Sequence, residues 1–395
     1  MSKLAITDLD LKGKRVFMRV DFNVPVKDGK VGDDLRIRAS VPTIQYAMDR
    51  GAVLILASHL GRPKGGVELK YSLAPVAARL TELLGKEVKF IPDCVGSAAE
   101  NAAAAARSGD VVLLENLRFY REEEDNDPGF AQKLARLAPL YVNDAFGTAH
   151  RAHASTEGIT HCVERAAAGF LMEKELRYLG DALEKPQRPF VAIMGGVKIS
   201  DKIEVIENLL GKVDTLLIGG AMMFTFLKSQ GKEIGKSHYE PDRLDLARDL
   251  MARAMNEGAS KILLPKDAIA STGIEDEASA HLVQAGRIPD GEMGLDIGAE
   301  TLAWYSATIR TAKTIVWNGP MGVFEKDAFA AGTLGIARAV AGSKAISIVG
   351  GGDSAAAVAK AGVVDQITHI STGGGASLEF LAGRILPGVA ALTDK

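Results

Sequence analysis

Short apolar runs alternate along the first half of the chain with segments in which apolar residues recur at helical spacing. The runs predict buried strands at 14–20, 53–58, 88–91, 111–114 and 140–142. Helical spacing occupies the segments between them, for example 74–84 and 130–137. Strands that alternate with helices in this way predict a parallel sheet that helices cover on both faces.

A second series of strands begins after an amphipathic segment. Residues 169–184 carry Leu171, Leu176, Leu179 and Leu183 at near-helical spacing with charges between them, which predicts an amphipathic helix. The proline-containing segment 185–189 ends that helix and favours a domain boundary there. The later runs predict strands at 190–194, 215–218, 261–264, 314–317 and 346–349. A chain of 395 residues is also too long for one typical core, so we predict an α/β protein with two domains.

Polar side chains gather where the strands of the first half end. The set comprises Asp21, Asn23, His59, Arg62, Arg118 and Arg151, with Arg36 on the loop after the first strand. Ligands of parallel sheets bind beyond the carboxyl ends of the strands, and guanidinium groups match phosphate and carboxylate geometry. Each arginine taken singly is also compatible with a solvated charge or an ion pair. Their recurrence at strand ends predicts an anion pocket.

Two other features of this half are given more modest roles. His59 is interpreted as a residue that contacts a ligand and not as a base, although a structural histidine is the commoner case. The acidic run 122–125 is interpreted as a solvated turn without chemistry.

Glycines follow the strands of the second half, most densely at Gly350-Gly351-Gly352-Asp353-Ser354. The run 346–349 predicts a strand, and Asp353 or Ser354 is expected to cap the alanine-rich helix that follows. A strand, a glycine turn and a helix N-terminus together favour a bound phosphate, beside which Asp353 could hold Mg²⁺. The alternative is an ordinary strand-to-helix loop, and the spacing is not that of a P-loop.

Other strand ends of this half repeat the pattern. Glycines occur at 195–196, 219–220, 319 and 373–375, which suggests repeated approach of phosphates to the backbone. Lys198 and Lys202 would share one face if a helix begins there, and could then bracket a transferring phosphoryl group. Two solvated lysines are the alternative. None of these glycines fits the dinucleotide-binding fingerprint, which argues against a nicotinamide-dependent dehydrogenase.

Composition and charge narrow the classes of partner and the cellular location that we expect for the protein. A net charge of −3 provides no basic field for nucleic acid or an anionic membrane surface. Two cysteines, Cys94 and Cys162, lack metal or redox spacing and are too few for a disulfide scaffold. The N-terminus lacks a signal peptide's apolar core, and no apolar run has membrane-spanning length. We therefore expect a cytoplasmic protein that binds neither nucleic acid nor membranes.

Eight motifs in order make the chain similar to the phosphoglycerate kinases. They are Arg19-Val20-Asp21-Phe22-Asn23-Val24-Pro25, His59-Leu60-Gly61-Arg62-Pro63, Glu115-Asn116-Leu117-Arg118-Phe119, Asn143-Asp144-Ala145-Phe146-Gly147, Gly195-Gly196-Val197-Lys198, Trp317-Asn318-Gly319-Pro320-Met321-Gly322, Gly350-Gly351-Gly352-Asp353-Ser354 and Thr372-Gly373-Gly374-Gly375-Ala376-Ser377. One departure is Val197, where that family usually has a smaller residue. We expect little consequence, because Val197 points away from Lys198 in a regular backbone.

The resemblance implies two Rossmann-like domains, each a parallel sheet covered by helices, joined by an interdomain helix and hinge. The boundaries would be 1–170 for the phosphoglycerate-binding domain, 171–189 for the helix and hinge, 190–379 for the nucleotide-binding domain and 380–395 for a segment that returns to the first domain. The acid substrate would be held by Asp21, Asn23, Arg36, His59, Arg62, Arg118 and Arg151. Nucleotide would be held by Lys198, Lys202, Gly219, Asn318, Glu325, Gly351, Gly352, Asp353 and Ser354, with Asp353 also on Mg²⁺ and Glu325 on the ribose.

The implied activity is reversible phosphoryl transfer from 1,3-bisphosphoglycerate to ADP, which gives 3-phosphoglycerate and ATP in glycolysis, in a monomer that closes about its hinge. Arg36 and Lys198 would stabilise the transferring group, with the main-chain N–H groups of Gly373 and Gly374 as further donors. Two rival classes stay open at this point. A dehydrogenase would need the missing fingerprint, and a non-catalytic anion- or nucleotide-binding protein would not need Arg36 and Lys198 together.

Overall fold

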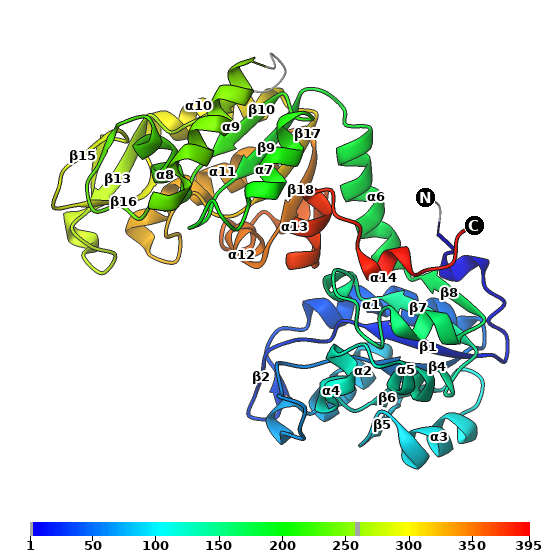
Figure 1. Ribbon diagram of the computed structural model, residues 1–395. Helices are drawn as coiled ribbons and strands as arrows, with labels where there is room; N and C mark the ends of the chain where they lie inside the picture. Colours follow the sequence, from blue (N-terminus) through cyan, green and yellow to red (C-terminus); the bar gives the residue numbers. More distant parts are fainter. Residues whose placement is uncertain (1–2, 257–260) are drawn as a thin grey trace. The chain divides into compact units, whose positions relative to one another are not determined.

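The computed structural model describes residues 3–256 and 261–395, which divide into two compact units. Unit 1 contains the chain up to Arg177 together with Ile385–Lys395, and unit 2 contains Tyr178–Arg384. Helix α6 (Phe170–Glu184) confirms the predicted amphipathic helix and runs from unit 1 into unit 2 (Figure 1).

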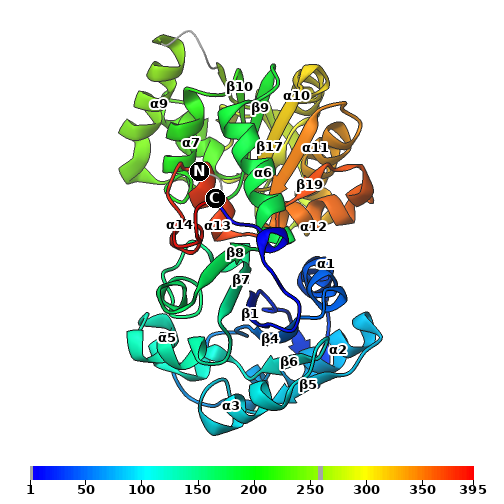
Figure 2. The ribbon, with the colours of Figure 1, turned by 90° about the vertical axis from the view of Figure 1, so that its right-hand side faces the viewer.

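Unit 1 is built on a parallel sheet of six strands. In spatial order they are β5 (Val88–Ile91), β6 (Val111–Leu114), β4 (Val53–Ala57), β1 (Arg15–Val20), β7 (Leu140–Asp144) and β8 (Arg165–Ala168). The short hairpin β2 (Val26–Lys27) and β3 (Lys30–Val31) follows β1. The helices are α1 (Leu35–Asp49), α2 (Ala74–Leu84), α3 (Gly96–Ala105), α4 (Arg121–Glu124), α5 (Pro128–Ala135) and α14 (Pro387–Ala390). Figure 2 shows α1 and α2 on one side of the sheet and α5 on the other.

Unit 2 repeats the architecture with a second parallel sheet of six strands. Their order is β12 (Lys261–Leu263), β10 (Thr215–Ile218), β9 (Phe190–Met194), β17 (Thr314–Asn318), β18 (Ile346–Gly350) and β19 (His369–Ile370). The helices are α7 (Ile203–Leu210), α8 (Met222–Ser229), α9 (Leu244–Asn256), α10 (Ala299–Thr311), α11 (Ala331–Ala341), α12 (Gly352–Lys360) and α13 (Gly375–Leu381). In Figure 2, α7 and α9 lie on one side of this sheet, and α10, α11 and α12 lie on the other.

A smaller antiparallel sheet in unit 2 was not predicted. It contains β14 (His281–Gln284), β13 (Asp267–Ser271) and β16 (Met293–Ile297), with the nearby pair β11 (Glu233–Ile234) and β15 (Arg287–Ile288). The two main sheets confirm the α/β fold class, because each is entirely parallel and lies between helices.

Chain topology fixes where ligands can approach each sheet. In unit 1 the connections run outward from β1 to β4 and later cross to β7 on the other side of β1. In unit 2 they run outward from β9 to β10 and later cross to β17 on the other side of β9. A crevice forms beyond the carboxyl ends of strands where the order reverses in this way. Both predicted clusters of polar and glycine residues follow these strands.

The packed interior reaches the edge of each sheet. Trp317 is fully buried on β17, and its indole N–H donates to the carbonyl of Gly319 at 2.8 Å. The tryptophan therefore fixes the first turn after its strand as well as filling the core. Within residues 3–256 and 261–395, none of the helices combines the length and hydrophobicity needed to span a bilayer.

Candidate functional site

The carboxyl edge of the unit 1 sheet brings several predicted residues together. Arg36 Nη1 lies 3.0 Å from Asp21 Oδ2 and donates to the Asn23 carbonyl at 3.3 Å. The side-chain oxygen of Asn23 accepts the Gly61 N–H at 2.9 Å, which attaches the loop after β4 to the end of β1. Arg36 lies in the first turn of α1 and not on a loop as predicted, because the β2–β3 hairpin takes up the intervening chain.

Arg118 is the most buried of the predicted anion-binding arginines. Its side chain is 3% exposed, Nη1 donates to the Gly61 carbonyl at 2.9 Å, and Nε lies 3.3 Å from Glu124 Oε1. No acceptor among the described residues lies within hydrogen-bond distance of Nη2. Burial lowers the pKa of Arg118 against the opposing effect of Glu124, and Arg19 and Arg151 lower it further. A buried guanidinium with a free N–H group is costly unless an anion completes its bonding.

The motif around Arg118 explains how that arginine is held. Glu115 accepts the N–H of Leu73 at 2.8 Å, and Asn116 donates from its amide to the carbonyls of Leu60 at 2.7 Å and Tyr71 at 2.9 Å. The loop between β4 and α2 is thereby fixed by the residues that directly precede Arg118. Glu115 and Asn116 therefore fix the loop that borders the predicted anion pocket.

His59 follows β4 and is 4% exposed. Burial lowers the pKa of His59 well below 6.5, and the charges of Arg19, Arg118 and Arg36 lower it further. The imidazole is therefore neutral at physiological pH. It lies in the pocket region as predicted, and its ring Nδ1 lies 3.2 Å from Nη2 of Arg19.

The other two arginines are less constrained. Arg62 is exposed and makes no ion pair or side-chain hydrogen bond with the described residues. Arg151 is half-buried, donates from Nε to His150 Nε2 at 3.1 Å, and lies close enough to Arg118 to lower its pKa. Both side chains can therefore turn toward a ligand without breaking an ion pair.

The interpretation of 122–125 as a solvated turn is wrong for Glu123. That side chain is fully buried, and its carboxylate accepts the Ser155 hydroxyl at 2.6 Å and the Ser155 N–H at 2.9 Å. The segment forms α4, which presents one face to the interior, so a run of acids is divided between core and solvent. Glu124, on the same helix, pairs with Arg118.

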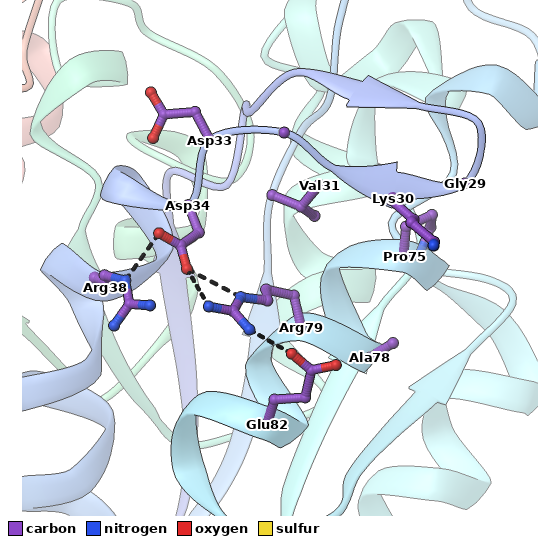
Figure 3. A pocket seen from close by; sticks show the side chains of 11 residues that line it. Gly29, Lys30, Val31, Asp33, Asp34, Arg38, Pro75, Ala78, Arg79 and Glu82 are labelled. Carbon is purple, nitrogen blue, oxygen red and sulfur yellow. Dashed lines mark hydrogen bonds and ion pairs between the residues drawn. The ribbon is translucent and has the colours of Figure 1, made fainter.

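A second pocket in unit 1, of about 660 Å³, lies between the β2–β3 hairpin and α2 (Figure 3). Asp34 accepts from Arg38 Nε at 2.8 Å and from Arg79 Nη2 at 2.7 Å, and Arg79 also pairs with Glu82. Both arginines are already paired with carboxylates, so neither is left free for an anion. Asp34 directly precedes α1, and this network therefore fixes the start of the helix that carries Arg36.

In unit 2, Asn318 lies at the carboxyl edge of the sheet, aligned with Met194 on β9 and Gly350 on β18. The Lys202 ammonium donates to the Asn318 carbonyl at 3.0 Å and also bonds the Asn318 side-chain oxygen. The buried Asn318 amide nitrogen has no acceptor among the described residues. It lies 3.2 Å from where a Cβ on Gly351 would be, so it faces the glycine turn.

The two predicted lysines are in different environments. Helix α7 begins at Ile203, so no helix places Lys198 and Lys202 on one face. Lys202 is 8% exposed, and burial lowers its pKa to about 8 against the opposing charges of Asp353 and Asp201. Lys198 is exposed and makes no ion pair or side-chain hydrogen bond with the described part of the chain.

The glycines of unit 2 are of two kinds. Gly195 and Gly319 are required by backbone packing, since an added Cβ would lie 2.0 Å from the Pro320 carbonyl and 2.3 Å from the Gly195 carbonyl, respectively. Gly219 packs against Met321, whose sulfur would lie 2.4 Å from an added Cβ. In contrast, Gly352 and Gly374 have open space where a side chain would be. Only the second kind leaves room for a ligand beside the backbone.

The start of α12 differs from the predicted capping arrangement. Gly351 occupies the N-cap position at φ 91°, a conformation that favours glycine, and no side chain of the described residues caps the helix. Asp353 and Ser354 lie inside the first turn. The Ser354 hydroxyl accepts the Gly319 N–H at 2.7 Å, and Asp353 is exposed. The first N–H groups of α12 therefore have no side-chain acceptor, which is the arrangement an anion completes.

The fit of this site to Mg²⁺ depends on Asp353. No group of three or more His, Cys, Asp or Glu side chains that could hold a metal ion occurs among the described residues. One exposed carboxylate beside an uncapped helix N-terminus is nevertheless a suitable donor set, because Mg²⁺ is commonly held by one or two carboxylates together with substrate phosphates and water. The residues present fit a magnesium ion that arrives with a nucleotide.

The last glycine turn precedes α13. The Gly373 N–H already donates to the Ser371 hydroxyl at 3.1 Å, so the expectation that it is a free donor is not met. Gly374 adopts φ 53° at the N-cap of α13, and its N–H makes no hydrogen bond with the described residues. Gly374 therefore has an available N–H donor in this turn.

An apolar pocket of about 330 Å³ was not predicted from the sequence. Its lining includes Val197, Gly220, Phe224, Leu295, Met321 and Val323. Gly219 and Glu325 do not line it, although both are close in sequence to residues that do. Val197 is 59% exposed and contributes to the wall, so the departure at this position affects the pocket surface. The lining comes from six separate segments, which is why no single motif indicates it.

Comparison with known proteins agrees with this geometry. The phosphoglycerate kinase family model matches residues 6–384. Phosphoglycerate kinases of Koribacter versatilis and Moorella thermoacetica are 60% and 58% identical, and each alignment covers 100% of both chains. The solved phosphoglycerate kinase of Coxiella burnetii superposes with a TM-score of 0.90 at 44% identity, and that of Pyrococcus horikoshii with 0.85 at 34%; each comparison covers 98% of both chains. The family model and these relatives, which cover nearly the whole chain with its two parallel sheets, show that the chain belongs to the phosphoglycerate kinase family.

Proposed function

We propose that the protein transfers a phosphoryl group reversibly between 1,3-bisphosphoglycerate and ADP, which gives 3-phosphoglycerate and ATP in glycolysis. The observation that carries the proposal is that hydrogen-bond donors without a partner among the described residues gather at the carboxyl edge of each sheet, on Arg118 in unit 1 and on Asn318 and the start of α12 in unit 2. The two sites differ in kind, because one is made of arginines and the other of glycine backbone beside an apolar pocket. Such a pair suits two different anionic substrates.

Unit 1 would hold the acid substrate. Arg118 offers a buried N–H group, Arg62 and Arg151 can close over the ligand, and His59 contributes a neutral hydrogen-bonding group. Asp21 and Asn23 orient Arg36 and the adjoining loop. We assign the phosphoglycerate to the whole set Asp21, Asn23, Arg36, His59, Arg62, Arg118 and Arg151.

Unit 2 would hold the nucleotide. The apolar pocket suits a flat nucleobase, and Glu325, just beyond its wall, would bond the ribose. The phosphates would lie at the uncapped start of α12, near Lys202, the free amide N–H of Asn318 and the backbone of Gly351, Gly352 and Ser354. Asp353 would hold Mg²⁺, which supplies positive charge to the phosphate oxygens when bound.

The chemistry requires alignment and charge stabilisation but no base. A carboxylate oxygen of 3-phosphoglycerate attacks the γ-phosphorus of ATP, and the bond to the ADP oxygen breaks. The acceptor has a pKa near ~3.5–4, so it is already an anion at neutral pH and has no proton to lose. Arg36 and Lys198 would neutralise the developing charge, together with the Gly374 N–H. Lys198 is well suited because no described residue holds it elsewhere.

A coupled turnover assay with 3-phosphoglycerate and MgATP tests the proposal. Turnover that requires both substrates, and that falls far more than substrate binding does in Arg36→Met and Lys198→Met, is the expected result. Binding of both ligands without turnover in the wild type would favour a non-catalytic binding protein. Hydride transfer from a nicotinamide cofactor would favour a dehydrogenase. We also expect a monomer in the cytoplasm, which size-exclusion chromatography with light scattering and cell fractionation can check.

A further inference from the structure

Arg19 is a fully buried arginine to which the proposed reaction assigns no role. It lies on β1, the central strand of the unit 1 sheet, between Ala57 on β4 and Asn143 on β7. A charged side chain is almost never fully buried unless its hydrogen bonds and its charge are satisfied. The partners of Arg19 therefore indicate what it does there.

Each nitrogen of the Arg19 guanidinium has a defined partner. Nε donates to the Ser155 hydroxyl at 2.8 Å, Nη1 donates to the Val20 carbonyl, and Nη2 lies 3.2 Å from His59 Nδ1. Arginine has only donors and is not deprotonated in proteins. The nitrogen of His59 that faces it must therefore be the acceptor. A neutral imidazole that accepts at Nδ1 carries its proton on Nε2.

Ser155 and Glu123 hold Arg19 through its Nε, whereas His59 faces its Nη2. The Ser155 hydroxyl accepts from Arg19 and donates its own proton to Glu123 Oε1 at 2.6 Å, while Glu123 Oε2 accepts the Ser155 N–H at 2.9 Å. Ser155 and Glu123 are both fully buried. Each bond in this chain has one possible direction, because the arginine only donates and the carboxylate accepts. Burial raises the pKa of Glu123, and the charge of Arg19 opposes that rise, so the guanidinium and the carboxylate stabilise each other's charge.

We propose that Arg19, held by Ser155 and Glu123, is a positioning residue that fixes His59 in its Nε2–H tautomer, so that His59 presents a donor to the anionic substrate. The inference rests on the proposed function for its kinetic consequence, although the tautomer itself does not depend on activity. The opposite tautomer would present a lone pair, which repels carboxylate and phosphate oxygens. No described residue accepts a hydrogen bond from Nε2, which leaves it available to the substrate.

Nitrogen NMR of the histidine rings in the substrate-free protein tests the tautomer directly. The His59 resonances are identified by their loss in His59→Gln. In the wild type, Nδ1 should resonate as an unprotonated imidazole nitrogen and Nε2 as a protonated one. In Arg19→Met and in Ser155→Ala, where Arg19 can turn toward Glu123, the two nitrogens should shift toward a tautomer mixture. Ser40→Ala removes another fully buried hydroxyl that takes no part in the hydrogen bonds from Glu123 to His59. It should leave both nitrogen shifts unchanged.

Kinetics of the same variants tests the consequence. Ser155→Ala should raise the KM for 3-phosphoglycerate by about 2- to 10-fold with little change in kcat or in the KM for ATP, because one donor to an anion is weakened. Restoring the hydroxyl with Ser155→Thr should restore both the tautomer and the KM. An Nδ1–H tautomer in the wild type would overturn the proposal. An unchanged Nε2–H tautomer in Ser155→Ala and in every Arg19→Met sample that folds would also overturn it.

The two readouts separate this inference from the proposed function. A wild-type protein that shows the Nε2–H tautomer but no phosphoryl transfer would refute the proposed function and support the positioning role of Arg19. A protein that transfers the phosphoryl group normally while His59 is in the Nδ1–H tautomer would support the proposed function and refute the positioning role of Arg19.

Discussion

Lys202 and His59 are both buried, and burial lowers the pKa of each with a different consequence. The pKa of His59 falls well below 6.5, so His59 stays neutral from pH 7 upward. The pKa of Lys202 falls to about 8, so Lys202 loses its proton within the range in which kinases are commonly assayed. An ordinary lysine, with a pKa near ~10.4, would stay charged throughout that range. Chemistry and nucleotide binding should therefore respond differently to pH.

The chemical step should be nearly independent of pH between about 7 and 8.5 when both substrates are saturating. The acceptor carboxylate and the phosphates are already ionised above pH ~6, and His59 has no proton to gain there. The measurement is rapid-quench transfer from ATP to 3-phosphoglycerate in the wild type and in His59→Ala. The variant should bind the acid substrate more weakly and still transfer the phosphoryl group. A tenfold rate rise per pH unit that vanishes in His59→Ala would make His59 a general base.

The KM for ATP should be flat below pH 8 and rise above it, by up to about tenfold per pH unit, because free enzyme with neutral Lys202 lacks one cation for the phosphates. Bound phosphate raises the pKa of Lys202 again, so the effect should appear in KM and not in kcat. Lys202→Met should have a high KM that no longer depends on pH in this range. An unchanged wild-type profile up to pH 9.5 would show that Lys202 does not contact the phosphates.

The arginines of unit 1 should differ in importance according to their burial. Arg62→Ala should raise the KM for 3-phosphoglycerate by about 10-fold, and Arg118→Ala by up to about 150-fold, because the desolvated charge makes the stronger bond. The KM for ATP should stay nearly constant in both variants, since the residues proposed to bind nucleotide belong to unit 2. Arg165→Ala, at an exposed arginine on β8, is the control. Equal losses of affinity for both substrates would contradict this division.

At the residues of the two sheet edges, the sequence indicates which residue types are present but not their burial or their contacts. Strand ends rich in arginine and glycine indicated which residues gather at one edge of each sheet, because a parallel sheet collects those ends at one edge. The sequence could not predict that Gly319 packs on backbone whereas Gly352 is open, since both are glycines after strands. Arg19 carried a usable signal that was overlooked. A charge inside the apolar run 15–20 of a central strand must be buried and therefore partnered.

Among the elements, α6 begins on a buried carboxylate. Asp144 ends β7, is fully buried, and accepts the N–H groups of Leu171 at 2.9 Å and Met172 at 3.4 Å. Burial raises the pKa of Asp144 to about 7, against the opposing effects of Thr43 and those two backbone N–H groups. The helix that connects the two units is thus anchored in unit 1 by a group that titrates near neutrality.

Asp144→Asn keeps an oxygen that can accept the Leu171 N–H but removes the titration. The folded pKa lies above the unfolded value of 3.8, so the folded state holds a proton that the unfolded state releases, and wild-type stability falls as pH rises between about 4 and 7. The stability of Asp144→Asn relative to wild type should therefore rise across this interval, by at most about 1.4 kcal/mol per pH unit, and level off above it. Denaturant unfolding at several pH values measures this difference. Asp181→Asn, at an exposed acid of the same helix, should show no such trend.

The elements that escaped prediction are those without a strong periodic pattern. Nearly all strands of the two main sheets were predicted because they are buried on both faces and read as continuous apolar runs. The strand β14 is mostly exposed, and β11 and β15 have two residues each, so neither alternation nor length distinguishes them from loops. The apolar pocket depends on β16 of the same small sheet, and it was missed for the same reason.

For the whole molecule, the proposed assignment of one substrate to each unit has a geometric consequence. Direct phosphoryl transfer requires the reacting atoms to approach within about 3–3.5 Å. If the acid substrate is bound by unit 1 and the nucleotide by unit 2, the units must adopt a closed arrangement during the chemical step. The connecting chain, α6 followed by the proline-containing segment 185–189, is the expected hinge, since hinges are a few residues at element ends.

Small-angle X-ray scattering should therefore give a larger radius of gyration for the free protein than for the complex with 3-phosphoglycerate and a non-hydrolysable MgATP analogue. Each ligand alone should produce a smaller change, because only the two together form contacts that favour the closed state. Arg118→Ala, which weakens the acid site, should shift the acid-substrate concentration required for compaction and leave the nucleotide concentration unchanged. Identical radii in the free and doubly liganded protein would mean that the units do not close, or that the two substrates are assigned to the wrong units.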